Sequence, residues 1–158
     1  MIVLLSSANL FGQNVMFLEF NKTYSEIVLE LQELNVEEIE FETDSRPLTA
    51  YYDGFTASYY FNHHHRLYKV EVLKNYAETR VMKDAVKGAV AYFEIVCDEV
   101  EHVANSKNRT QTVKGGQKDR RFEMEITTFA KNDTEVTIIG IDNKYAPSAA
   151  YLNAHAAR

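Results

Sequence analysis

The chain has 158 residues, of which 46% are hydrophobic and 25% are charged, and it contains only two prolines. This length and composition are typical of one globular domain and exclude an intrinsically disordered chain. The net charge of −6 argues against nucleic acid as a partner, because phosphate binding requires clustered Lys and Arg. The single cysteine, Cys97, excludes an internal disulfide.

The first residues, MIVLLSSANLFGQ, combine an apolar run with small residues, as the end of a secretory signal peptide does. Ser6 and Ala8 suit cleavage before Asn9, and cleavage before Gln13 also fits. No Lys or Arg precedes the apolar run, so a first buried strand is the alternative interpretation. The run is too short to span a membrane. We therefore expect residues 1–12 to be a signal-peptide remnant and the protein to be periplasmic or secreted.

A short helix is predicted next. Thr23 and Glu26 match the capping box, in which each side chain satisfies a free backbone N–H of the other residue. Apolar residues then recur at helical spacing, which predicts a helix over about 24–34. Residues 38–42 alternate acidic and apolar side chains, so this segment is expected to be a strand with its acids facing water.

Three consecutive histidines, His63–His65, lie between two predicted strands. Residues 49–62 are rich in Tyr, Phe and Thr, and residues 67–73 alternate in hydrophobicity. On an extended strand His63 and His65 would share a face, as metal ligands often do, but a metal site also needs a third and usually a fourth ligand. No such ligand stands nearby in the sequence, so we interpret the histidines as a turn.

From Thr79 the hydrophobic period changes to that of a helix. The apolar stripe steps by four and three residues and predicts one long helix over about 79–105. Phe93 lies in the middle of the stripe and is expected to anchor the core, and Cys97 borders the stripe and is expected to be buried. The stripe comprises Met82, Val86, Ala89, Phe93, Val96, Val100 and Val103.

Strands are predicted again after a basic segment. Residues 122–128 alternate, residues 131–133 resemble a turn, and residues 135–141 form a last, mostly apolar strand. Runs of strands around one long helix indicate an α+β fold, a single antiparallel sheet packed by the two helices. We expect one domain over residues 13–142 and a flexible C-terminal tail over residues 143–158.

The basic segment is the candidate binding surface. Residues 105–121 hold six cations against one acid, Asp119, for a local charge of +5, so the rest of the chain carries −11. Such opposed charges can steer an anionic partner to one end of a molecule, although a merely solvated loop is the simpler interpretation. With Gly115 and Gly116 at its centre, the segment is expected to be a flexible hairpin connection. The candidate residues are Lys107, Arg109, Lys114, Lys118, Arg120 and Arg121.

No pattern of catalytic residues stands out in the sequence. Glu99 and His102 have the Glu-x-x-His spacing of di-iron bundles, but such bundles need a second copy and further glutamates on other helices. The Gly115–Gly116 segment lacks the Gly-Lys-Ser/Thr of a phosphate loop, and no G-x-S-x-G is present. We therefore expect no catalytic residues, no resident metal and no cofactor.

Two stretches resemble small exported bacterial domains of the Gram-negative envelope, whose function is uncharacterised. In these domains a short helix begins with a polar Thr/Ser…Glu start, and a later hairpin has the form Tyr-x-Phe, polar turn, Leu-Tyr-x-Val. Thr23 and Glu26 match the first stretch. The second is matched by Tyr59, Phe61, Leu67, Tyr68 and Val70. The resemblance covers about the first half of the chain and implies an envelope location, without implying a catalytic residue.

The sequence thus favours an exported, non-enzymatic binding or protein-interaction domain. Its partner would be a protein or an anionic envelope component. One alternative is a metal-dependent hydrolase that uses His63 and His65. Another is a cytoplasmic, acidic inhibitor or immunity-like protein, in which residues 1–11 form a structural strand.

Overall fold

A computed structural model describes residues 20–34, 36–41, 43, 46–52, 54–105, 109–130 and 133–148 of the chain. The expected signal-peptide remnant, residues 1–12, lies outside the described residues, as does Lys107. The expected tail is described only as far as Ser148.

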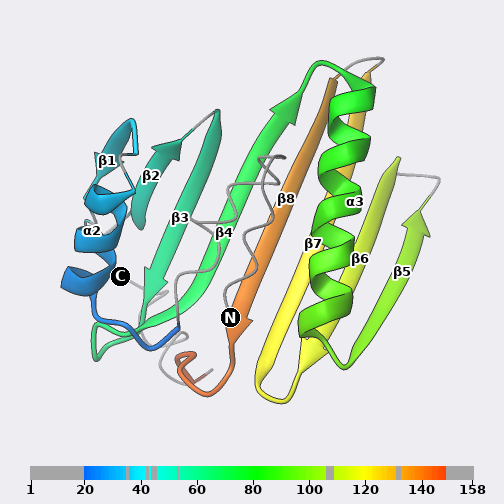
Figure 1. Cartoon of the computed structure of the whole chain (residues 1–158). Helices are drawn as coiled ribbons and strands as arrows, with labels where there is room; N and C mark the ends of the chain where they lie inside the picture. The colour runs from blue at the N-terminus through cyan, green and yellow to red at the C-terminus, as the bar shows by residue number, and fades with distance from the viewer. Residues whose placement is uncertain are drawn as a thin grey trace, which may run out of the picture.

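The described chain forms one antiparallel sheet of eight strands with two helices, which confirms the α+β fold (Figure 1). The strand order is β1-β2-β3-β4-β8-β7-β6-β5. Helix α3 carries the chain from β4 to the far edge of the sheet. Strands β5 to β8 then return from that edge, so that the last strand, β8, pairs with β4. The elements are α2 (Tyr24–Glu33), β1 (Glu38–Glu40), β2 (Leu48–Tyr52), β3 (Phe55–Phe61), β4 (Leu67–Tyr76), α3 (Thr79–Val96), β5 (Glu99–Asn105), β6 (Thr110–Gln117), β7 (Arg120–Ala130) and β8 (Asp133–Asp142).

The predicted capping box starts helix α2. The backbone N–H of Thr23 donates to Glu26 Oε2 at 2.6 Å, and the N–H of Glu26 donates to Thr23 Oγ1 at 3.3 Å. The hydrogen bond from the Thr23 hydroxyl is the largest cause that lowers the pKa of Glu26. Ile27 and Leu31, one turn apart, are fully buried and attach the helix to the sheet.

The predicted long helix is too long, because α3 ends at Val96 and residues 99–105 form strand β5. Cys97 has φ −106° and ψ 145°, so the backbone is already extended there. β5 pairs with β6 along its whole length, and β-branched Val100 and Val103 suit a strand. Only Val100 and Val103 extended the helical stripe beyond Val96. Two residues are too few to distinguish the helical period from the strand period, so the sequence pattern did not show where the helix ends.

One face of the sheet holds the hydrophobic core. Alternate residues of neighbouring strands lie side by side in the register, as Ala57, Val72, Ile138 and Met124 do. These residues share one buried cluster with side chains of both helices. Phe93 of α3 is fully buried, as predicted, and its ring centroid lies 5.7 Å from that of Phe122 in β7.

The other residues of these strands point to the opposite face, here called the open face. Neither described helix contributes to it, and its side chains on β3, β4, β7 and β8 are half-buried or exposed. On β3 and β4, Lys69 Nζ lies 4.3 Å from the centroid of the Tyr60 ring and 3.0 Å from Glu71 Oε2. On β8 the open face carries Ile139 and Ile141. It therefore mixes apolar, aromatic and charged groups.

Neither helix in the described ranges has both the length and the apolar character that crossing a lipid bilayer requires.

Candidate binding pocket on the open face

The basic segment is a hairpin, as predicted, but most of it is regular strand rather than a flexible connection. β6 and β7 pair from Thr110 to Gln117, and only Lys118 and Asp119 form the turn. Lys118 has φ +52°, which a tight two-residue hairpin turn requires. Gly115 and Gly116 lie inside β6, where glycine marks a close approach of neighbouring groups.

Four of the six candidate cations lie around one pocket of about 950 Å³. They are Lys114, Lys118, Arg120 and Arg121. Arg109 lies at the other end of the hairpin, where its carbonyl accepts a hydrogen bond from the Thr128 N–H at 3.2 Å. The structure therefore assembles most of the predicted site.

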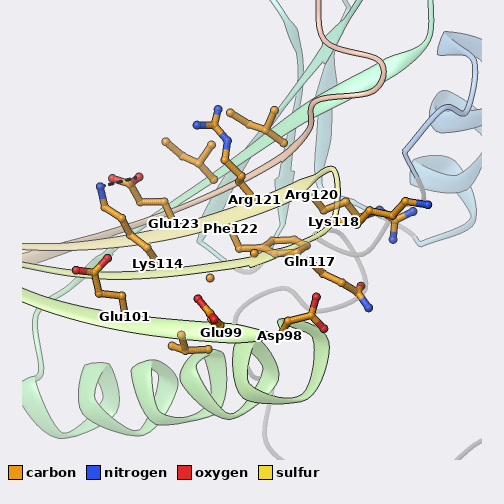
Figure 2. Close-up of a pocket in the computed structure, with 15 residues that line it drawn as sticks. Asp98, Glu99, Glu101, Lys114, Gln117, Lys118, Arg120, Arg121, Phe122 and Glu123 are labelled. Atoms are coloured by element: carbon orange, nitrogen blue, oxygen red, sulfur yellow. Dashed lines mark ion pairs between the residues drawn. The ribbon is translucent and has the colours of Figure 1, made fainter.

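Gly116 lines the pocket on the open face, and the space above it, between Glu99 and Arg121, is here called the hollow. Figure 2 shows Glu99 and Arg121 among the side chains that line the pocket. Glu99 of β5 and Arg121 of β7 flank Gly116 in the register, and Gly116 places no side chain between them. A Cβ added there would meet only the Arg120 carbonyl oxygen, at 3.4 Å. Because residues two strands apart are separated by about 10 Å, a ligand group can enter between Glu99 and Arg121.

A row of alternating charges borders this hollow. Glu101, Lys114 and Glu123 are cross-strand neighbours, and Lys114 Nζ lies 3.5 Å from Glu123 Oε2. In contrast, neither Lys118 nor Arg121 forms an ion pair with any described residue. These two cations are therefore available to a ligand.

Arg120 has a structural role instead. Its side chain belongs to the helix-covered face, where Nε donates to Asp142 Oδ2 at 3.2 Å. Asp142 is only 4% exposed, and its other oxygen accepts the Lys144 N–H at 3.0 Å. The Asn143 N–H donates to the Asp119 carbonyl at 2.7 Å, so the first residues of the expected tail are bonded to the β6–β7 turn.

Sequence reasoning missed the acidic half of the pocket. Asp98, Glu99, Glu101 and Glu123 line it together with the cations, so the surface is of mixed charge rather than basic. The helical stripe predicts Glu99 and Glu101 at the end of the long helix, whereas both lie on strand β5. The alternation of Glu99, Val100 and Glu101 was the available signal for a strand.

The three histidines lie in the turn between β3 and β4, as predicted. Asn62 organises this turn, because its Oδ1 accepts the N–H groups of His64 and Arg66 at 2.9 and 3.0 Å. His65 has φ +55°. All three histidines are exposed, and no group of three or more His, Cys, Asp or Glu in the described ranges could hold a metal ion.

Replacing His63–His65 by Ser-Asn-Gly is expected to leave the fold intact. Glycine at position 65 suits the left-handed backbone of His65, so the melting temperature should stay unchanged or rise slightly. Thermal denaturation and metal analysis of untagged protein check this. Loss of a stoichiometric metal ion on replacement would show that the histidines are ligands.

No known family model, curated protein sequence or solved structure matches the chain, so similarity to known proteins assigns it to no family.

Proposed function

We propose that this protein is an exported, non-enzymatic binding domain of the periplasm or cell exterior, and that it binds its partner in the pocket over Gly116. The unpaired Arg121 beside the hollow is the observation that carries the proposal. An exposed cation contributes little to folding stability, so Arg121 can serve binding without being needed for the fold. The signal-like first residues support export.

The chemistry of the pocket favours a protein partner over an anionic lipid surface. Arg121 can bind a carboxylate through two parallel hydrogen bonds. Glu99 and Glu101 lie in the same pocket and would repel a uniformly anionic surface. A protein segment with a carboxylate next to a cationic side chain satisfies both sides of the hollow. Ile139 and Ile141, on the neighbouring strand β8, supply apolar contact area beside the hollow.

Removing the two cations that form no ion pair should weaken binding without unfolding the protein. We expect Lys118→Ser with Arg121→Ser to weaken the complex at least about tenfold, or about 1.4 kcal/mol, because both cations line the pocket. Lys83→Ser with Lys87→Ser on α3 is the matched control, since it removes the same charge from exposed helix positions. The partner is captured from native envelope extract, purified, and titrated against each variant.

A second variant tests the shape of the hollow independently of the charges around it. Gly116→Val fills the space between Glu99 and Arg121 while leaving every charge in place, and valine favours strands. Binding should be lost with little change in melting temperature. Full affinity in both this variant and the charge variant, also at raised salt, would overturn the proposed site.

Export is tested independently of the pocket. Mass spectrometry of the protein from its native source should find a mature N-terminus at Asn9 or Gln13. Retention of Met1 in an intracellular fraction would contradict export and favour the immunity-like alternative. The described residues give the hydrolase alternative no support, because His63 and His65 lie in an exposed turn without further ligands.

A further inference from the structure

Strand β5 is a long, uncovered outer edge of the sheet. It spans seven residues, and all of them except Val100 are exposed. The opposite edge, β1, has only three residues, two of which are glutamates. Short, charged edge strands resist pairing with other chains, whereas long exposed ones invite it. The described part of the chain thus protects one edge of the sheet and leaves the other accessible (Figure 1).

The register shows which backbone groups of β5 point outward. The two-residue turn at Lys118–Asp119 makes Gln117 and Arg120 a hydrogen-bonded pair, and the bonds of an antiparallel ladder alternate from there. The even-numbered residues of β6 therefore bond to their β5 partners, which are Glu99, Glu101, Val103 and Asn105. Val100, His102 and Ala104 direct their N–H and C=O groups away from the sheet.

We propose that the β5 strands of two copies of this chain pair antiparallel around a two-fold axis at His102. This register places Val100 opposite Ala104 of the second copy, and all three outward-pointing residues find partners. About six backbone hydrogen bonds result, two for each pair. The interface is isologous, as two-fold dimers require, and joins the two sheets into one.

The charges at the ends of β5 are complementary in this arrangement. Glu101 faces Val103 of the second copy and Glu99 faces Asn105, so no acid opposes an acid. Asp98 of one copy lies next to the β5–β6 connection of the other, which carries Arg109. Arg109 is exposed, forms no ion pair with a described residue, and is separated from Asp98 by about two strand spacings, or about 10 Å. The two-fold axis repeats this contact at the other end of the interface. The contact gives a role to Arg109, the described candidate cation that does not line the pocket.

A concentration series followed by sedimentation or light scattering tests the dimer. Wild-type protein should change from monomer to dimer as its concentration rises. His102→Pro removes the outward N–H on the axis, at a position where an edge strand tolerates proline, and should be monomeric throughout. An unchanged melting profile at low concentration shows that this variant folds.

Charge reversal keeps the proposal testable if the proline variant does not fold. Arg109→Glu and Asp98→Arg should each weaken the dimer at least about tenfold, and the double variant should restore it. Both residues are exposed, so the fold should tolerate the changes. A wild-type monomer up to about 1 mM would overturn the dimer, as would a dimer that neither single reversal weakens. Arg109 lies outside the pocket, so Arg109→Glu tests the dimer without changing the partner site. Asp98 lines the pocket, so partner binding is compared only in the Arg109→Glu variant.

Discussion

Phe93→Ala is expected to lower the free energy of unfolding by about 3–5 kcal/mol. Phe93 is fully buried and packs against the ring of Phe122, and it belongs to the same core cluster as Met124. Truncation leaves a cavity between α3 and the sheet that the surrounding strands cannot close, because cross-strand hydrogen bonds hold them in register. Urea denaturation monitored by circular dichroism measures the loss.

Ile95→Ala is the matched control for this prediction. Ile95 lies two residues further along α3 and is 81% exposed, so its truncation should change stability by less than about 0.5 kcal/mol. Equal effects of the two substitutions would mean that α3 does not bury the Phe93 side of the helix. Such a result would contradict the two-layer arrangement.

Gly115→Ala is expected to destabilise the protein by about 1–3 kcal/mol through overpacking. A Cβ at Gly115 would lie 2.6 Å from Cys97 Sγ, closer than non-bonded atoms come, and 3.1 Å from Cys97 Cβ, which is tighter than most such contacts. Cys97 follows α3 directly, so it cannot move aside without disturbing the start of β5. Gly116→Ala is the control, because a Cβ there meets only one atom, at 3.4 Å, and alanine should be tolerated.

A second substitution should rescue the first. Cys97→Ala removes the sulfur from the clash, so the double variant should recover much of the stability that Gly115→Ala loses.

The reactivity of the Cys97 thiol supplies an independent test of the same contact. Cys97 is half-buried rather than buried as expected, and this partial burial, with a smaller contribution from Asp98, raises the pKa of its thiol, which favours the protonated, less reactive form. We expect faster labelling in Gly115→Ala, and unchanged labelling would argue against the contact.

Strands and caps whose signals are local could be predicted from the sequence. The Thr23–Glu26 capping box forms as expected, because its partners lie within one helical turn. The alternation in residues 67–73 and 122–128 predicted β4 and β7, since a strand with one buried face repeats every two residues. The histidine turn followed from its position between two such strands. The antiparallel α+β class followed from the order of these segments.

The tertiary structure decided the rest, because the deciding contacts join distant parts of the chain. Residues 99–105 fit a helix or a strand by sequence, and pairing with β6 made them a strand. That same pairing brought Glu99 and Glu101 beside the predicted cations, so a basic loop became a pocket of mixed charge. The sequence does not distinguish the neighbouring glycines Gly115 and Gly116. In the strand they point to opposite faces, so Gly115 packs against Cys97 and Gly116 borders the hollow. The sequence by itself determines which charged side chains the chain carries. Which of them meet around Gly116 depends on the strand register, because long-range backbone hydrogen bonds set that register.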